Sequence, residues 1–138
     1  MRDVFCKIID GEIPSTKVYE DDDVLAILDI SQTTTGHTLV LPKKHYDSFL
    51  SCPVDLMTKV YAVAQRIGQA EVSILGAKGV NILANCGEAA GQTVPHFHVH
   101  VIPRYIGGEG GFHLTMEGQD TSKLNLPLLA SKLGDAMK

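Results

Sequence analysis

The stretch Pro95-His96-Phe97-His98-Val99-His100-Val101-Ile102-Pro103 alternates histidine with apolar residues. Side chains alternate between the two faces of a β-strand, so we expect a strand over residues 94–102 with its histidines on one face. Its other, apolar face can pack into a core, which turns the three imidazoles toward a cleft or solvent. Burying three imidazoles costs desolvation unless each finds a partner. The pattern therefore indicates a functional site rather than core filling.

The segments around this strand predict an α+β domain with a mainly antiparallel sheet and one long helix packed on it. Further strands are expected over residues 16–20, 24–30, 36–42 and 80–85, where apolar runs lie between turn residues. A long helix is expected over residues 53–75, with Pro53 as its first residue and Ser51 or Cys52 as its cap. Its buried stripe would be Leu56, Val60, Val63, Ile67, Ala70 and Ile74. A last helix is expected over residues 122–135.

Length and composition fit one globular domain, since 138 residues with 44% hydrophobic residues can bury a core. The formal net charge of −4 argues against a partner bound through nucleic-acid phosphates. No apolar run approaches the roughly 20 residues of a membrane span, and the N-terminus lacks the apolar core of a signal peptide. Three widely spaced cysteines, Cys6, Cys52 and Cys86, argue against a disulfide framework and favour the cytoplasm.

Two chemistries suit a face of histidines. Imidazoles at alternate strand positions can converge on one zinc ion. Alternatively, one neutral imidazole attacks phosphorus and forms a nucleotidyl-histidine, while its neighbours hold its tautomer and donate protons. The preceding loop of small residues, which ends in Gln92 and Thr93, favours the second chemistry. Its amide and hydroxyl donors can meet charge on phosphate oxygens, which a simple metal cage does not need.

Residues 91–101, Gly-Gln-Thr-Val-Pro-His-Phe-His-Val-His-Val, resemble the signature of the histidine triad (HIT) superfamily. The resemblance covers residues 3 to about 105 in the family's order and spacing. Its other motifs are Phe5-Cys6-Lys7-Ile8-Ile9 with Glu12-Ile13-Pro14, then Tyr19-Glu20-Asp21-Asp22, Leu28-Asp29-Ile30-Ser31, and Gly36-His37-Thr38-Leu39-Val40-Leu41-Pro42-Lys43-Lys44-His45.

This resemblance implies a homodimer of α+β subunits that bind an AMP-like purine nucleotide. The HIT domain would be residues 1–110, and residues 111–138 would be a C-terminal extension of the same domain or one packed on the dimer partner. The catalytic residues would be His98 as nucleophile, His96 and His100 as groups that orient it and contact phosphate, and His37. Asp29 would bind the ribose hydroxyls, because a carboxylate offers a diol several acceptor sites. An apolar base slot would be formed by Phe5, Ile8, Ile27 and Ile30, and the phosphate would be held by Asn85, Gln92 and Thr93.

Each of these residues also has an ordinary structural role open to it. Asp29 can cap the turn before Ser31, which for that residue alone is the simpler interpretation. Phe5 and the isoleucines can belong to the core, and His37 can be a hydrogen-bonded strand histidine. Only their joint arrangement around the triad favours nucleotide binding.

Many bacterial proteins that resemble this chain hold a structural zinc through two cysteines near the N-terminus, the histidine after a Lys-Lys pair and the first triad histidine. Cys6, His45 and His96 match that set, but Asp3 stands where the other cysteine would be. A carboxylate can bind zinc, so Asp3-Cys6-His45-His96 is chemically possible. The loss of one thiolate weakens the site, so the sequence slightly favours a metal-free protein, and no cofactor is expected for catalysis.

Two branches of the superfamily compete. Residues 88–93 and 102–104 resemble the dinucleoside polyphosphate hydrolases, whereas residues 5–14 resemble the nucleotide-binding branch, whose members cleave adenosine phosphoramidates. We therefore expect hydrolysis of one of these two substrate types at the α-phosphorus through nucleotidyl-His98. The alternatives are a non-catalytic purine nucleotide-binding or interaction protein with the same pocket, and a zinc protein whose histidines are structural.

Overall fold

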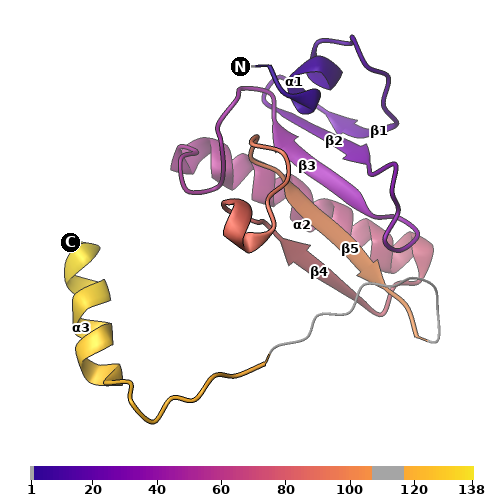
Figure 1. Cartoon of the computed structure of the whole chain (residues 1–138). Coiled ribbons are helices and arrows are strands. Elements are labelled where there is room, and N and C mark those ends of the chain that lie inside the picture. The colour runs from indigo at the N-terminus through magenta and orange to yellow at the C-terminus, as the bar shows by residue number, and fades with distance from the viewer. Residues whose placement is uncertain (1, 107–116) are drawn as a thin grey trace.

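The computed structural model describes residues 2–106 and 117–138. Its body is an antiparallel sheet in the order β1-β2-β3-β5-β4, crossed on one face by the long helix α2 (Figure 1). The strands are β1 (Lys17–Glu20), β2 (Val24–Leu28), β3 (Thr38–Pro42), β4 (Gly79–Leu83) and β5 (Val99–Arg104). The predicted α+β class, with a mainly antiparallel sheet and one long helix on it, is confirmed.

Helix α2 spans Val54–Leu75, and Gly76 ends it in the left-handed conformation that glycine adopts at little cost. Pro53 lies at the cap position with no side-chain cap, so the predicted cap at Ser51 or Cys52 is wrong. The expected buried stripe is also wrong at its end, because Ala70 and Ile74 are exposed. A strict alternation of four and three steps drifts by about 20° per seven residues on a straight helix. The buried face therefore continues through Ala64, Gly68 and Glu71 instead.

The two faces of the sheet carry separate apolar clusters. On one face, the valines of β3 and β5 pack with Phe97 against Val60 and Ile67 of α2. On the other face, Phe5 packs against Leu25, Ile27, Leu39 and Leu41. Phe5 belongs to helix α1 (Val4–Ile9), which the sequence analysis did not predict. Six residues are too few to show a helical period, and a helix this short depends on its cap and its packing.

The histidine segment is only partly a strand. β5 begins at Val99, so the strand predicted to start at residue 94 is wrong at its N-terminal end, and His96 and His98 precede it. Residues 96–98 are held outside the sheet by a backbone hydrogen bond, in which the Phe97 N–H donates to the Tyr46 carbonyl at 2.7 Å. The alternation of faces still holds, because Phe97, Val99 and Val101 lie in the core beside α2.

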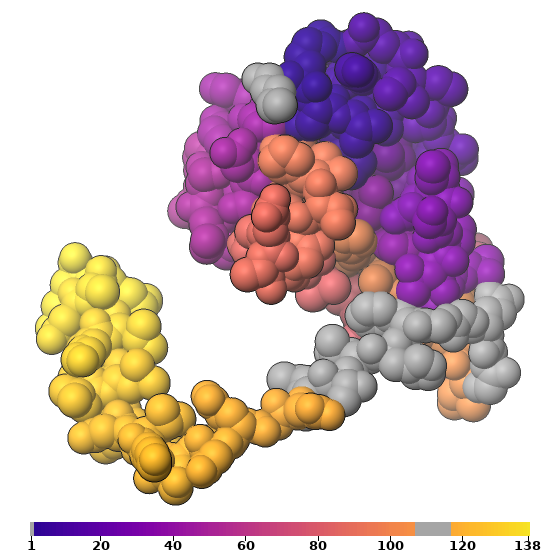
Figure 2. Space-filling model, viewed as in Figure 1, coloured from indigo at the N-terminus to yellow at the C-terminus, as the bar shows by residue number. Residues whose placement is uncertain are grey.

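The C-terminal helix α3 spans Leu126–Ala136, four residues later than predicted at its start. Asn125 caps it by accepting from the Leu128 N–H, and Pro127 takes a place in its first turn. Residues 117–138 are all exposed, and Figures 1 and 2 show α3 standing clear of the body. The glycine-rich connection and the domain boundary at residue 110 lie outside the described residues.

No helix in the described part of the chain is long and apolar enough to cross a membrane. Cys6, Cys52 and Cys86 are free cysteines. The cytoplasmic location inferred from cysteine usage stays a prediction.

Candidate active site

The ring of His98 is held in one tautomer by the backbone. Its Nδ1 lies 2.7 Å from the carbonyl oxygen of His96. A carbonyl only accepts hydrogen bonds, so Nδ1 carries the proton and the neutral ring keeps its lone pair on Nε2. Burial lowers the pKa of His98, which keeps the ring neutral near pH 7. An uncharged imidazole with a free Nε2 is the form that can attack phosphorus.

A second pair of histidines forms a directed hydrogen-bond chain. The Thr33 N–H donates to His37 Nδ1 at 3.3 Å, so the proton of neutral His37 is on Nε2. That nitrogen lies 2.9 Å from His100 Nδ1 and donates to it. His100 therefore carries its own proton on Nε2 and remains a donor there. Burial, followed by the neighbouring charges of His98 and His37, lowers the pKa of His100 to about 4, and burial also lowers the pKa of His37.

His98 and His100 line a pocket of about 310 Å³ between α1 and the ends of β2 and β3. This volume is at the lower end of ordinary small-ligand sites, roughly 300 to 1,000 Å³. The structure brings into its wall eight of the residues predicted for catalysis or nucleotide binding: Phe5, Ile8, Ile27, Asp29, Ile30, Thr93, His98 and His100. Ile30 lies at the rim, where its side chain is 99% exposed. Val4, Ile13 and Pro14 also line the pocket and were not predicted as site residues.

The two oxygens of Asp29 have different surroundings. Oδ1 accepts from the Ser31 N–H at 2.8 Å, so the structural role considered for this residue is real. Oδ2 lies 3.6 Å from His37 Nε2, and Asp29 is one of the residues that line the pocket. One carboxylate thus both closes a turn and presents an acceptor beside the histidines.

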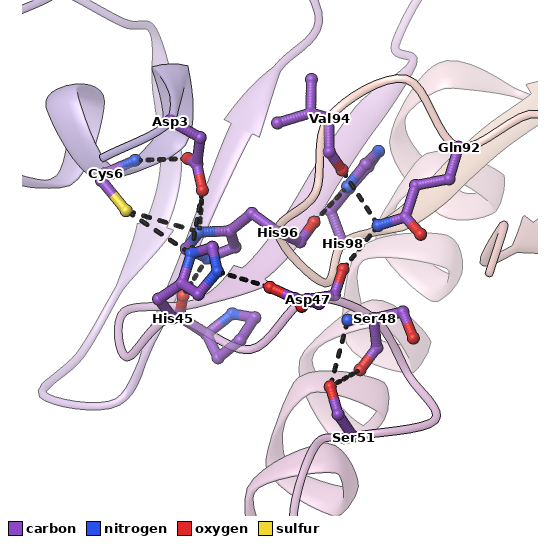
Figure 3. A network of polar contacts seen from close by, with 11 residues as sticks. Asp3, Cys6, His45, Asp47, Ser48, Ser51, Gln92, Val94, His96 and His98 are labelled. Atoms are coloured by element: carbon purple, nitrogen blue, oxygen red, sulfur yellow. Dashed lines mark hydrogen bonds and ion pairs between the residues drawn. The ribbon is translucent and has the colours of Figure 1, made fainter. Parts of the chain in front are cut away.

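The loop before the triad is fastened by Gln92. Its side-chain amide donates to the carbonyls of Asp47 and Val94 at 2.6 and 2.9 Å (Figure 3). Its side-chain oxygen accepts from the Gly87 N–H. Neither Gln92 nor Asn85 lines the pocket, whereas Thr93 does. In this structure Gln92 sets the position of the loop, and its contact with phosphate stays a prediction.

His96 points away from the pocket into a second cluster with Asp3, Cys6 and His45 (Figure 3). Its Nδ1 lies 3.2 Å from Asp3 Oδ2, and His45 Nδ1 lies 2.9 Å from the same oxygen. Cys6 Sγ is 3.7 Å from His45 Nδ1 and 3.8 Å from His96 Nδ1. Burial raises the pKa of Asp3, but the Cys6 N–H and the charge of His96 outweigh it, so the pKa is lowered and the carboxylate is ionised.

The outer nitrogens of both imidazoles in this cluster have acceptors. His96 Nε2 lies 2.9 Å from the Pro42 carbonyl oxygen, and His45 Nε2 lies 2.9 Å from Asp47 Oδ1. When both rings are neutral, protons on these outer nitrogens leave the Nδ1 lone pairs directed toward Asp3 and Cys6, which is the arrangement found around protein-bound metals. When the rings are protonated, the same Nδ1 atoms donate to Asp3 Oδ2. Asp47 follows His45 by two residues and could have been proposed as its partner, but nothing in the sequence indicates the Pro42 or Thr33 contacts.

The spacing of these four donors fits a tetrahedral zinc ion. Zinc–ligand distances of about 2.0 to 2.3 Å place two nitrogen or oxygen ligands about 3.3 Å apart, and sulfur about 3.6 Å from nitrogen. The four separations between Asp3 or Cys6 and the two imidazoles run from 2.9 to 3.8 Å, and all four donor atoms lie within 4.8 Å of one another. Asp29, His37 and His100 form another close group. There the His37 lone pair faces the Thr33 N–H and its proton faces His100, so that group is not arranged for metal binding.

Similarity to known proteins covers the histidine segment and most of the chain around it. The HIT domain family matches residues 10–107 of the chain. The chain is 50% identical over 107 residues to Protein hit of Bacillus subtilis, which is 78% of this chain and 74% of that protein. It is 44% identical over 101 residues to the adenylylsulfatase HINT3 of Arabidopsis thaliana, which is 73% of this chain and 51% of that protein.

Two solved structures are similar over nearly the whole chain. A HIT family protein from Bacillus anthracis is 44% identical with a TM-score of 0.90, covering 98% of this chain and 96% of its own. A zinc-bound histidine triad family protein from Mycobacterium smegmatis is 40% identical with a TM-score of 0.74, covering 96% of each chain.

Proposed function

Because the chain belongs to the HIT domain family, we propose that it is a hydrolase that cleaves nucleotides at the α-phosphorus through a nucleotidyl-His98 intermediate. The observation that carries this proposal is the hydrogen bond from His98 Nδ1–H to the His96 carbonyl. It leaves a neutral Nε2 lone pair on a ring that lines a nucleotide-sized pocket.

The reaction takes two displacements at one phosphorus. In the first, the His98 Nε2 lone pair forms a bond to the α-phosphorus while the bond to the leaving group breaks. In the second, water replaces His98 on phosphorus and releases the nucleoside monophosphate. Dividing the reaction in this way replaces one difficult displacement with two easier ones.

His100 supports the charge that develops on phosphate. Its Nε2–H remains available because its Nδ1 accepts from His37, and a preorganised donor in a buried site stabilises oxygen charge more than it would in water. The pKa of His100, about 4, means that this donor is a neutral imidazole at pH 7. His37 acts through His100, as a positioning residue.

The pocket supports recognition of the nucleoside. Phe5, Ile8 and Ile27 supply apolar surface for a purine base, and Asp29 Oδ2 supplies an acceptor for ribose hydroxyls. Thr93 lines the pocket, which supports its proposed contact with phosphate, and we keep Asn85 and Gln92 in the proposal as further phosphate ligands.

We include a structural zinc in the proposal, against the slight preference of the sequence, because the donor spacing fits one and a similar structure is described as zinc-bound. Asp3, Cys6, His45 and His96 would hold it. Bound there, zinc would cross-link α1, the segment after β3 and the histidine segment. The chemistry at phosphorus is assigned to His98 and His100.

The substrate is proposed by class. Adenosine phosphoramidates and dinucleoside polyphosphates share a nucleoside monophosphate group and differ in what leaves the phosphorus. One relative is named an adenylylsulfatase, which adds adenylyl sulfate to the candidates because only its leaving group differs. A pocket that recognises the shared nucleoside monophosphate group accepts all three substrates. The preferred leaving group therefore has to be identified from the rates at which the three substrates are hydrolysed.

We also propose that the protein works as a homodimer with residues 111–138 packed on the partner. Helix α3 carries Leu126, Leu129 and Leu133 on one side, and all three are exposed. An isolated helix of this length is only marginally stable in water, so such a stripe needs a surface to cover. The mass of the full chain and of a chain ending at residue 117, measured by light scattering, tests this directly.

Turnover of the three substrates in parallel tests the function. The protein and its His98→Ala variant are each given a fluorogenic adenosine phosphoramidate, a diadenosine polyphosphate and adenylyl sulfate. We expect at least one to be hydrolysed, and His98→Ala to slow it by about 10³-fold or more. Equal rates for the two proteins would exclude the intermediate.

The second candidate is a nucleotide-binding or interaction protein without turnover. The pocket alone supports it, since every contact proposed for the base and ribose serves binding equally well. Tight AMP binding by calorimetry, together with no turnover of any of the three substrates, would favour this candidate.

A further inference from the structure

Asp3 uses its two carboxylate oxygens for two different elements. Oδ1 accepts from the Cys6 N–H at 2.9 Å and so caps the first turn of α1. Oδ2 faces His45 Nδ1 and His96 Nδ1 in the donor cluster. A cysteine side chain at this position could bind a metal, but its sulfur is a weaker hydrogen-bond acceptor than a carboxylate, and aspartate is among the best helix caps.

Helix α1 in turn forms one wall of the nucleotide pocket. It carries Phe5, which is buried and packs edge-on against the His98 ring with centroids 4.9 Å apart, and Ile8, which lines the pocket. A six-residue helix has little stability of its own, so its position depends on the groups that fix its ends. Asp3 fixes its beginning.

His96 provides a second link from the cluster to the pocket. Its side chain lies among the four donors, and its backbone carbonyl holds the Nδ1–H of His98. The two links reach different parts of the site. Asp3 and Cys6 act on the base slot through α1, whereas His96 acts on the nucleophile.

We propose that Asp3 couples metal binding to nucleotide binding: the carboxylate that completes the Cys6–His45–His96 donor set also caps α1 and thereby places Phe5 and Ile8 in the pocket. This inference rests on the nucleotide pocket of the proposed function. It assigns to Asp3 a role for which the usual cysteine is unsuited, and it predicts that metal removal weakens nucleotide binding more than it slows the chemical step. Asp3 is thus a positioning residue.

Zinc content and AMP affinity, measured without turnover, test this coupling. The full-length protein is loaded with zinc, dialysed, and analysed for metal, and AMP binding is then measured by calorimetry before and after chelation. We expect one zinc per chain and an AMP affinity that falls at least tenfold on chelation. With a turned-over substrate, KM should rise by more than kcat falls.

Two substitutions separate the two oxygens of Asp3. Asp3→Asn keeps a cap but loses the charged ligand, so we expect zinc binding at least tenfold weaker and an AMP affinity that no longer responds to chelation. Asp3→Cys restores a thiolate but loses the cap, so we expect tighter zinc binding together with weaker AMP binding than in the zinc-loaded parent. Asp55→Asn, in the first turn of α2, is the matched control and should behave as the parent.

A second reporter identifies the donor set itself. Cobalt in place of zinc should show the visible bands of a tetrahedral site with a single thiolate-to-metal charge-transfer band, and that band should gain intensity in Asp3→Cys. The parent protein with and without chelator decides the coupling even if a variant does not fold.

The outcomes distinguish this inference from the proposed function. If AMP binds and His98-dependent turnover occurs but chelation changes neither AMP affinity nor KM, the coupling is wrong and the function stands. Absence of stoichiometric zinc in the parent also overturns the coupling alone. Absence of AMP binding under every condition overturns both.

Discussion

Two clusters, each of histidines with a carboxylate, lie on either side of His98, and their protons are arranged in opposite ways. In the Asp3–Cys6–His45–His96 cluster, the outer ring nitrogens face the Pro42 carbonyl and Asp47, so the lone pairs of the neutral rings converge on the centre. In the Asp29–His37–His100 cluster, the Thr33 N–H starts a chain that passes an N–H from each ring to the next. The first arrangement suits a cation, and the second suits a proton donor to phosphate.

The difference shows that residue type does not decide the role of a histidine here. Both clusters contain two imidazoles and a carboxylate whose nitrogen and oxygen atoms lie within 4.8 Å of one another. The hydrogen-bond partners behind the rings decide the role. An acceptor such as a carbonyl or a carboxylate fixes the proton on the ring nitrogen that it contacts and leaves a lone pair on the other nitrogen, and a donor such as the Thr33 N–H has the opposite effect.

The largest expected effect separates the two clusters by substitution. His37→Ala removes the donor to His100 Nδ1, so we expect kcat/KM to fall by about 10²- to 10³-fold, within the range of positioned proton donors. His45→Ala removes a metal ligand, so we expect zinc to be lost while kcat stays within about tenfold of the parent. Steady-state kinetics and elemental analysis of both variants provide the comparison.

His37→Gln provides the control, because its amide can still donate toward His100 and should recover part of the lost rate. Loss of kcat in His45→Ala as large as in His37→Ala would show that the clusters do not have separate roles.

An intermediate effect is expected at Glu71, a buried carboxylate that belongs to neither histidine cluster. Glu71 of α2 is buried against β3, with a long contact to the Thr38 hydroxyl at 3.5 Å and no partner among the described residues for its other oxygen. Burial raises the pKa of Glu71 from its usual 4.5 to about 7. Between these values the unfolded chain is ionised while the folded chain holds a proton, so the folded state loses stability as pH rises.

Between pH 5.5 and 8.5, wild type should therefore lose about 2 kcal/mol of unfolding free energy that Glu71→Gln does not lose. Denaturant unfolding of both proteins at the two pH values measures it. Parallel pH dependence in the two proteins would contradict the prediction.

The smallest expected effect is in the acid limb of the pH–rate profile. Burial lowers the pKa of His98 below its usual 6.5, and the neutral ring is the nucleophile, so kcat/KM should reach half of its plateau value at a pH below 6.5. At pH 6.5 the rate should therefore still exceed half of the plateau rate. An acid limb centred at or above pH 6.5 would place a different group in control of the rate.

The alternation of the histidine segment pointed to His98 and His100, whereas the resemblance to the HIT superfamily supplied the other predicted pocket residues: Phe5, Ile8, Ile27, Asp29, Ile30 and Thr93. The alternation around His98 gave the correct separation of core and site faces even though β5 begins only at Val99. Periodicity could not reveal α1, because six residues are too few to show a helical period. It also gave the wrong end of the buried stripe on α2, because the buried face of a straight helix drifts away from a seven-residue repeat.

The sequence by itself determined the fold class, the histidine segment and the set of groups available to it. Periodicity and residue chemistry are local properties, so they can be read from the sequence without knowing which residues become neighbours in the fold. The tertiary structure alone decided which ring nitrogen of His96 and of His100 carries the proton. These protons depend on partners distant in the chain: the Pro42 carbonyl, 54 positions from His96, accepts from it, and His37, 63 positions from His100, donates to it. Only folding brings these acceptors and donors to the rings, and with them the division between a metal cluster and a catalytic one.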